Sequence, residues 1–201
     1  MFTGIVQAIA GVRKAAQKNN GLVLAIEKPK GWKIAKGDSI AADGVCLTVA
    51  RVIKGGYLVE LMPETLKKTY FAKNAPEKVN LERPLRLSDL LGGHLVSGHI
   101  DAVGVIRETK QVGASRVYKI NYPKKFQLLI VKKGSISVDG ISLTLTDIGP
   151  AWFKVSLVDH TLKHTTIVSK KIGDFVNLEF DIIAKYLNRF MKYAKRTKRR
   201  A

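Results

Sequence analysis

The sequence predicts an all-β protein: two tandem six-stranded antiparallel Greek-key barrels with a C-terminal amphipathic α-helix. An internal repeat divides the 201 residues into two similar halves, and each half consists of short β-branched segments separated by turn-forming residues. A stripe of apolar residues near the end of the chain predicts the helix. We expect barrels over 1–90 and 91–184, and a helix with a basic tail over 185–201.

The repeat is visible as four sequence blocks that occur twice in the same order, at offsets of 94 to 97 residues. Offsets that drift by so little indicate a tandem duplication with small changes in loop length. The paired blocks are 4–8 with 98–102, 43–49 with 139–145, 65–69 with 161–165, and 79–82 with 176–179.

Each half contains about six short strands, and neither shows long helical periods. Turn-forming runs such as 19–21, 36–38, 43–44 and 55–56 separate the strands of the first half. A closed barrel is expected because closure removes the exposed edges of an open sheet. We read 63–69 and 159–165 as short helical turns or loops. The clearest strand segments are 22–27, 39–42, 46–52, 57–61, 116–121, 135–138, 142–147 and 153–157.

The C-terminal helix is expected to begin near Asp181 and to carry one apolar stripe. We predict that this stripe mediates oligomerisation, and the alternative is that it packs against the chain's own barrels. The residues at helical spacing are Ile183, Tyr186, Leu187, Phe190 and Tyr193.

Composition and charge restrict the class of protein. With one cysteine, Cys46, the chain forms no internal disulfide and no cysteine-based zinc cluster. There is no apolar run of the roughly 18–20 residues that cross a bilayer and no basic signal-peptide region, so we expect a cytoplasmic location without membrane contact. The net charge of +19 could attract nucleic acid, but the basic residues are dispersed except at 192–201, and no aromatic or finger motif accompanies them. We expect no specific nucleic-acid binding.

Matched positions in the two halves predict two similar pockets. Gly4 and Gly98 allow close backbone approach, and Thr48 and Thr144 offer hydroxyl groups, which suits a flat heterocycle with polar edges. Reactive side chains differ at other matched positions. We therefore expect the two pockets to bind two similar molecules and to give them different roles in a reaction. The differing pairs are Cys46 with Ser142, Ile5 with His99, and Glu64 with His160.

The motifs MFTGIVQ, DGVCLTV, PETLKKT, VNLE, GGHLVSGHID, DGISLTL and VNLEFD occur in order over nearly the whole chain, from 1 to about 186. Together they resemble the riboflavin synthase family, which also includes lumazine-binding fluorescent proteins that keep the fold without the reaction. The resemblance implies the dismutation of two molecules of 6,7-dimethyl-8-ribityllumazine. One molecule donates a four-carbon unit to the other, giving riboflavin and 5-amino-6-ribitylaminouracil.

The resemblance further implies that no metal or redox cofactor takes part and that the protein is a homotrimer. Each site would lie between the N-terminal barrel of one chain and the C-terminal barrel of another, and the resemblance leaves open an association with lumazine synthase. The alternatives are a non-catalytic lumazine or flavin carrier of the same fold and, from another class, a basic nucleic-acid-binding module. The presence of a histidine and a thiol at the matched pockets favours the enzyme.

The resemblance also implies which residues line each pocket. His94, Asp139 and Asp181 occupy motif positions with less defined roles. In the N-terminal pocket we expect Gly4, Ile5, Val6, Cys46, Leu47, Thr48, Glu60, Leu61, Met62, Pro63, Glu64 and Thr65. In the C-terminal pocket we expect Gly98, His99, Ile100, Lys133, Ser142, Leu143, Thr144, Ser156, Leu157, Val158, Asp159, His160 and Thr161.

The reaction requires that a proton leave the 7-methyl group of one lumazine and that a nucleophile or water activate the other. His99 is the preferred general acid or base. Ser142, together with Thr144, would orient the ring or the nucleophile; Cys46 would add to a ring carbon if its thiol were activated. Lys133 would stabilise the anion electrostatically. Each of these residues has a structural alternative. Cys46 would be a small buried strand residue, His99 a structural histidine, Lys133 a surface lysine, and Ser142 a hydrogen-bond partner of the backbone.

One pair departs from the family pattern. The second half carries Asp159-His160 where the first half has Pro63-Glu64, whereas family members often have a Pro-Glu-Thr motif in both halves. This loop would contact the ligand through its backbone and Thr161, so we expect binding to survive, and the effect of the changed charge at position 160 on affinity is left open.

Overall fold

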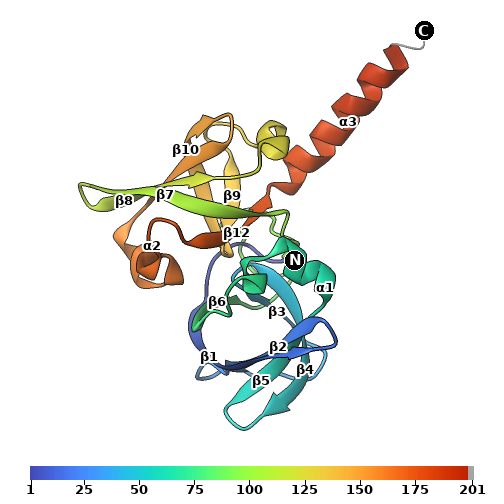
Figure 1. The fold of residues 1–201 in the computed structure, drawn as a ribbon, viewed down its shortest axis with the longest axis vertical. Helices are drawn as coiled ribbons and strands as arrows, with labels where there is room; N and C mark the ends of the chain where they lie inside the picture. Colours follow the sequence, from blue (N-terminus) through green and yellow to red (C-terminus); the bar gives the residue numbers. More distant parts are fainter. Residues whose placement is uncertain (199–201) are drawn as a thin grey trace.

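The computed structural model describes residues 1–198, which form two closed six-stranded barrels followed by a protruding helix (Figure 1). The all-β fold class with a C-terminal helix is confirmed. The first barrel contains β1 (Ala8–Lys18), β2 (Gly21–Glu27), β3 (Ser39–Ala42), β4 (Val45–Ile53), β5 (Gly56–Leu61) and β6 (Lys78–Glu82). The second contains β7 (Ala102–Val112), β8 (Ser115–Asn121), β9 (Ser135–Val138), β10 (Ile141–Gly149), β11 (Trp152–Leu157) and β12 (Phe175–Phe180).

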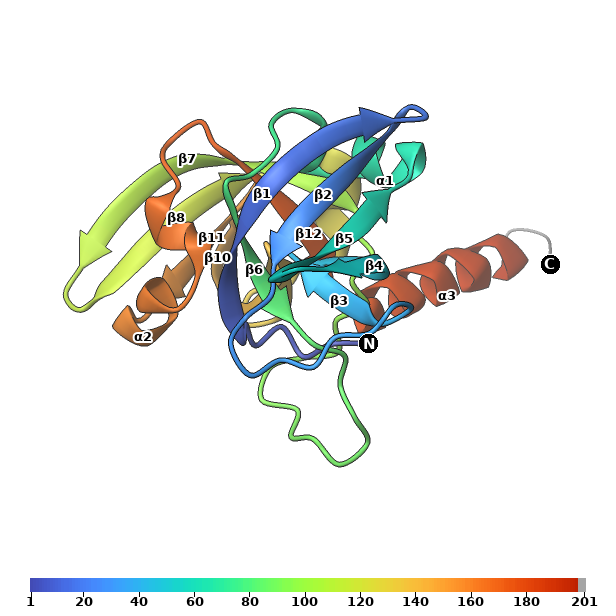
Figure 2. The same cartoon turned by 90° about the horizontal axis from the view of Figure 1, so that it is seen from below.

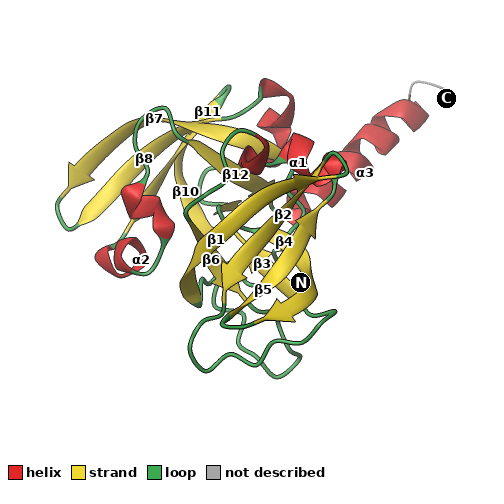
Figure 3. Ribbon diagram, turned by 60° about the horizontal axis from the view of Figure 1, so that its bottom comes forward, coloured by secondary structure: helices red, strands yellow, loops and turns green. Residues whose placement is uncertain are grey.

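The two barrels have the same topology. Around the first, the order is β1-β2-β5-β4-β3-β6, with all neighbours antiparallel, and the second repeats this order with the corresponding strands. Figure 3 shows that strands form both barrels and that the short helices lie outside them. These helices are α1 (Pro63–Lys68), α2 (Asp159–Lys163), and the 3₁₀ helices η1 (Tyr70–Ala72), η2 (Lys124–Leu129) and η3 (Thr166–Ser169). The sequence indicated α1 and α2 but none of the three 3₁₀ helices.

Helix α3 (Ile182–Lys198) begins one residue after Asp181 and extends away from both barrels (Figures 1 and 2). Its first turns contact η2, and Lys185 Nζ lies 2.6 Å from a carboxylate oxygen of Asp101. Among the helices of residues 1–198, none combines the length and apolarity needed to cross a membrane. The last part of the expected basic tail, 199–201, lies outside the described residues.

Alternation along each strand separates a barrel's core from its outer surface. In β4 the side chains of Val45, Leu47 and Val49 are buried, whereas Cys46 is half-buried and Thr48 is exposed. The period of two in a strand sends successive side chains to opposite faces, so the apolar set fills the barrel and the intervening residues face outward. Strand β10 has the same pattern at the matched positions.

Two buried asparagines join the barrels across their interface. The Nδ2 group of Asn80 on β6 donates to the backbone oxygen of Asp139 at 2.9 Å, and Nδ2 of Asn177 on β12 donates to that of Asp43 at 3.0 Å. Their Oδ1 atoms accept from the backbone N–H of Thr166 and of Tyr70, at 2.8 and 2.9 Å. The four bonds relate the halves by an approximate twofold axis and satisfy both buried amides.

Two buried carboxylates lie beside these asparagines, in the tight turns before β4 and β10. The Asp43 carboxylate accepts from the Asn80 backbone N–H at 2.8 Å and from the Tyr70 hydroxyl. Asp139 instead faces an ammonium group, with Lys170 Nζ at 3.2 Å. Burial, together with the nearby charge of Asp139, raises the pKa of Asp43 to about 7. The Lys170 ammonium therefore faces one of the two buried carboxylates, and burial favours the neutral form of the other.

The raised pKa of Asp43 has a consequence for stability. Between its ordinary value of 3.8 and about 7, the unfolded chain ionises this carboxyl while the folded chain keeps the proton, so the free energy of unfolding falls as the pH rises through this window. Asp43→Asn cannot ionise, and it accommodates the positive φ of 43° at this turn. Relative to the unsubstituted chain, we expect the variant to gain roughly 3 kcal/mol between pH 4 and pH 7. Urea unfolding across that range measures the difference, and parallel curves would contradict it.

Candidate functional site

The expected site residues gather in two patches on the outer faces of the barrels. The first patch contains Cys46 and Thr48 on the outer face of β4, with the backbone of Gly98 against them: Cys46 N–H donates to Gly98 O at 2.9 Å. The second patch contains Ser142 and Thr144 on the outer face of β10. There Ser142 N–H donates to Gly4 O at 2.7 Å.

This arrangement corrects the expected pocket walls, because the segments before β1 and before β7 cross between the barrels. Residues 4–6 lie against the second barrel and 98–100 against the first, the reverse of the expectation. The side chain of Val6 packs on the second core, and Ile100 is part of the first. The two segments that cross between the barrels also pair with each other, through two backbone hydrogen bonds between Phe2 and Val96.

Several expected pocket residues point into the cores instead. Their positions follow from strand alternation, since each is one residue away from an outward side chain. Ile100 is 8% exposed, and the others are less exposed than that. These residues are Leu47, Leu61, Ile100, Leu143 and Leu157. Their side chains support the patches from beneath.

The expected pocket residues 60–65 and 156–161 lie beside the two patches. Strand β5 runs beside β4 with Val59 opposite Val49, which brings the exposed Glu60 level with Thr48 on the outer face. In the second barrel, Ser156 is brought level with Thr144 in the same way. Beyond them lie the exposed Met62 and Val158 and the helices α1 and α2, which carry Pro63–Thr65 and Asp159–Thr161. A hollow of about 100 Å³ follows the N-terminal rim, beside Lys18, Glu60, Met62 and Pro63.

The two segments that cross to the opposite barrel, 2–6 and 96–100, are called the crossing segments. Each approaches the facing strand so closely that a glycine is required, at position 4 in one and at position 98 in the other. Gly4 has a φ of +76° and Gly98 of +82°, in the left-handed region. A Cβ at Gly4 would lie 2.6 Å from the Cβ of Ser142, and one at Gly98 would lie 2.5 Å from the Cβ of Cys46. Each crossing backbone therefore rests directly on the residue at which the two patches differ.

The serine of the second patch has a histidine partner that the sequence left undefined. His94 Nδ1 lies 2.7 Å from Ser142 Oγ, and burial lowers the pKa of His94 while the charge of Asp181 partly offsets this. A neutral imidazole accepts a hydroxyl proton, so the pair is suited to general base work. Gly93 fixes its position, because a Cβ there would lie 2.1 Å from Thr3 O. The Gly-Gly-His motif was the available signal in the sequence.

His99 belongs to the first patch. Its backbone N–H donates to Ser97 Oγ at 3.2 Å, its imidazole is exposed, and it follows Gly98 on the crossing segment beside Cys46. The two patches thus differ in their polar pairs. The first combines an exposed histidine with the half-buried thiol of Cys46, and the second has a histidine in direct contact with the hydroxyl of Ser142.

Two further expectations concern single positions. Lys133 has an exposed side chain and a φ of 70°, and its backbone N–H donates to Leu145 O at 2.8 Å, just as Gly37 N–H donates to Val49 O in the first half. In α2, Asp159 pairs with Lys163 at 2.6 Å, and the rings of His160 and His164 stack.

The stacked rings replace a salt bridge. His160 and His164 occupy the positions matched to Glu64 and Lys68, which pair at 2.9 Å in α1. The departure at position 160 is therefore accompanied by a matching change one turn later.

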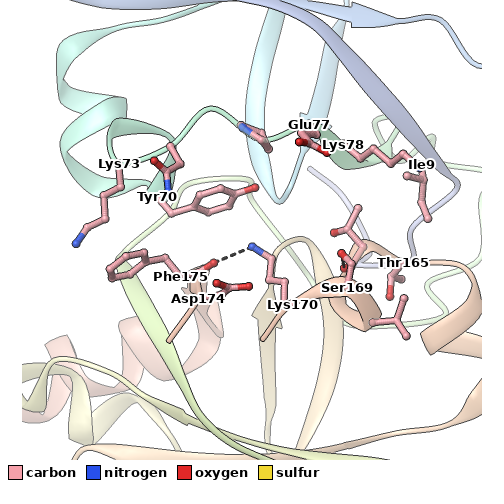
Figure 4. A pocket seen from close by; sticks show the side chains of 14 residues that line it. Ile9, Tyr70, Lys73, Glu77, Lys78, Thr165, Ser169, Lys170, Asp174 and Phe175 are labelled. Atoms are coloured by element: carbon pink, nitrogen blue, oxygen red, sulfur yellow. Dashed lines mark hydrogen bonds between the residues drawn. The ribbon is translucent and has the colours of Figure 1, made fainter. Parts of the chain in front are cut away.

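A larger cavity, of about 510 Å³, lies between the barrels and away from both patches (Figure 4). Lys170 crosses it, donating to Phe175 O at 2.7 Å, and Lys73 Nζ lies 3.8 Å from the centre of the Phe175 ring. None of the expected site residues lines this cavity. In residues 1–198, no three side chains of His, Cys, Asp or Glu gather closely enough to hold a metal ion.

Two barrels of one topology with equivalent outer patches define a duplicated ligand-binding protein. The family model for the lumazine binding domain matches this chain twice, at 3–84 and 97–181, so the chain belongs to the lumazine-binding domain family, and within it to the riboflavin synthases. These are enzymes of the transferase class.

Full-length relatives support this membership. Riboflavin synthase of Actinobacillus pleuropneumoniae is 41% identical over 95% of this chain and 90% of its own length. The enzymes of Mycobacterium bovis and Bacillus subtilis are 42% and 36% identical, covering 96% and 98% of this chain and 100% and 93% of their own lengths. LumP in complex with riboflavin has the same fold, with a TM-score of 0.82 at 24% identity over 90% of this chain and 99% of that chain.

The close contact at Gly98 predicts the effect of adding one methyl group. Gly98→Ala should lower the free energy of unfolding by more than about 2 kcal/mol, because left-handed strain and a clash with Cys46 act together. Gly113→Ala is the matched control: its φ is +57°, but a Cβ there meets nothing within 4 Å, so we expect a loss of about 1 kcal/mol. Chemical denaturation of both variants gives the comparison, and equal losses would show that the contact with Cys46 is unimportant.

Proposed function

We propose that the chain catalyses the dismutation of two molecules of 6,7-dimethyl-8-ribityllumazine into riboflavin and 5-amino-6-ribitylaminouracil, with one lumazine on each kind of patch. The observation that carries the proposal is the pair of equivalent frames with different reactive side chains. Both offer an outward threonine and a crossing glycine backbone, Thr48 with Gly98 and Thr144 with Gly4, which suit the polar edges of one heterocycle. Full-length relatives named riboflavin synthase support the same conclusion.

The different side chains would give the two lumazines different roles. In the second patch, His94 and Ser142 form a base and hydroxyl pair that can direct a nucleophile or water at one ring. In the first, His99 and Cys46 lie beside the other ring, and His99 remains the proposed acid or base for the proton of the 7-methyl group. The two products together contain all atoms of the two substrates, so the four-carbon transfer needs no external oxidant or reductant.

A second copy of the chain is needed to bring the reacting rings together. Both patches lie on outer surfaces, and we propose that the first patch of one protomer faces the second patch of another in a homotrimer. Figure 1 shows α3 standing clear of the barrels. Its large apolar side chains beyond Ile182 are 55–71% exposed, and a groove of about 410 Å³ separates it from the end of η2. Such a surface is typical of a protein–protein interface.

Two alternative functions, a carrier and a nucleic-acid-binding module, make different predictions from the enzyme. LumP has the same fold and was solved with riboflavin or with the lumazine bound, which makes a carrier the nearest alternative. A nucleic-acid-binding module would require affinity that falls steeply with salt. We propose that the basic residues form a solvated surface, that the location is cytoplasmic, and that any association with lumazine synthase is additional to catalysis.

Incubation of the purified protein with 6,7-dimethyl-8-ribityllumazine tests the proposed function. We expect riboflavin to form, followed by its absorbance and fluorescence, whereas tight binding without riboflavin would identify a carrier. His99→Ala should still bind the lumazine but turn it over about 100-fold more slowly, the usual loss for a general acid or base. His164→Ala, outside the expected pockets, is the control for removal of an exposed imidazole and should change turnover less. Unchanged turnover in His99→Ala would exclude His99 from the mechanism.

The proposed trimer predicts that a charge on α3 will dissociate the assembly. Phe190 is 67% exposed, so Phe190→Asp should leave the barrels folded while it separates the protomers and removes most of the turnover. Arg189→Gln, on the adjacent polar side of the same helix, should leave both unchanged. Size-exclusion chromatography with light scattering reports the mass, and a trimer that persists in Phe190→Asp would place the interface elsewhere.

A further inference from the structure

Each crossing segment is held by one buried glutamate. Glu82, the last residue of β6, accepts three hydrogen bonds, from Thr3 N–H at 2.6 Å, Thr3 Oγ1 at 2.7 Å and Gly4 N–H at 3.0 Å. Thr3 Oγ1 in turn accepts from the Ile5 N–H at 3.1 Å. The side chain of Glu82 therefore fixes the backbone turn that carries Gly4 and Ile5.

The second half repeats this arrangement atom for atom. Glu179 on β12 accepts from Ser97 N–H at 2.7 Å, Ser97 Oγ at 2.6 Å and Gly98 N–H at 2.8 Å, and Ser97 Oγ accepts from the His99 N–H at 3.2 Å. The two glutamates are 4% and 1% exposed. A buried carboxylate is costly unless its hydrogen bonds are made, so each turn is held tightly.

The glutamates act across the barrel boundary. Glu82 belongs to the first barrel, where it pairs with Ala41, but the Gly4 backbone that it holds rests on Ser142 of the second. Glu179 belongs to the second barrel, and the Gly98 that it holds rests on Cys46 of the first. In both contacts the glycine backbone accepts a hydrogen bond from the facing residue and packs too closely to admit a Cβ, so we expect a shift of the turn to move the patch.

We propose that Glu82 and Glu179 are positioning residues, each setting the ligand wall of the opposite barrel: Glu82 the patch of Ser142, and Glu179 the patch of Cys46. The proposal deepens the proposed function and rests on it for the identity of the ligand. A carboxylate is required at both positions because it accepts on both oxygens. A glutamine would present an amide N–H₂ to a backbone N–H and lose one of the acceptors.

Thiol reactivity offers a separate reporter for each patch. Cys46 is the only cysteine and is half-buried, so its alkylation by iodoacetamide reports the first patch. The chain with Cys46→Ser and Ser142→Cys carries one thiol at the matched position of the second patch. Glu82→Gln and Glu179→Gln are each placed in both reporter chains. Glu108→Gln, which removes an exposed carboxylate paired with Lys119, is the control.

We expect a crossed result. Glu179→Gln should raise the alkylation rate of Cys46 about tenfold and leave the second reporter unchanged, and Glu82→Gln should do the reverse; the factor corresponds to the loss of one hydrogen bond to a charged group. Glu108→Gln should change neither. Equal effects of both glutamate variants on both reporters, or effects confined to each glutamate's own barrel, would overturn the proposal.

A milder pair of substitutions covers the case in which a glutamate variant does not fold. Thr3→Val and Ser97→Ala each remove one hydroxyl from a clamp while the carboxylate stays. They should give the same crossed pattern with a smaller change in rate, and a uniform rise at both reporters would count against the proposal.

Protection by riboflavin separates failure of the positioning role from failure of the proposed function. In the chains without glutamate substitutions, riboflavin at saturating concentration should slow alkylation of both thiols if the patches bind the heterocycle. Absence of protection would refute the assignment of the ligand, whereas the crossed pattern of rates tests the clamps independently.

Discussion

The hydrogen bonds made by Asn80 and Asn177 across the barrel boundary are the interaction on which the rest of the structure depends. Each side-chain amide uses its N–H₂ and its oxygen on backbone groups of the opposite barrel. Because both amides are buried, their bonds specify one relative placement of the barrels, and an altered placement would leave polar groups unpaired. The Asp43 and Asp139 turns are held at the same axis.

The fixed placement allows the crossing segments to serve both barrels. Residues before β1 and β7 pair with each other through Phe2 and Val96, and each continues over the outer face of the opposite barrel. Each patch is therefore composite: its floor is an outward strand face, that of β4 or β10, and its edge is a glycine backbone from the other half. Neither barrel alone contains a complete patch, which gives a physical reason for the barrels to remain fused in one chain.

In the proposed function, small departures from symmetry supply the chemistry. The frame is repeated down to the hydrogen bonds of Glu82 and Glu179, yet the side chain against the crossing glycine is a thiol in one patch and a hydroxyl with a histidine partner in the other. The same contrast is seen on the axis, where Tyr70 faces Asp43 and Lys170 faces Asp139. In the proposed function, symmetry preserves the geometry of binding, and the exceptions allow two identical substrates to react differently.

The sequence by itself determined the duplication, the strands, the final helix and the matched threonines, because alternation with a period of two and turn-forming pairs are local properties of the chain. It did not determine which barrel each glycine segment touches. Residues 4–6 and 98–100 occupy equivalent places in the repeat, so a crossed and an uncrossed arrangement have the same sequence pattern. Only the tertiary structure decided between them, since the crossing depends on long-range contacts of Gly4 with Ser142 and Gly98 with Cys46. The contact of His94 with Ser142 was hidden for the same reason.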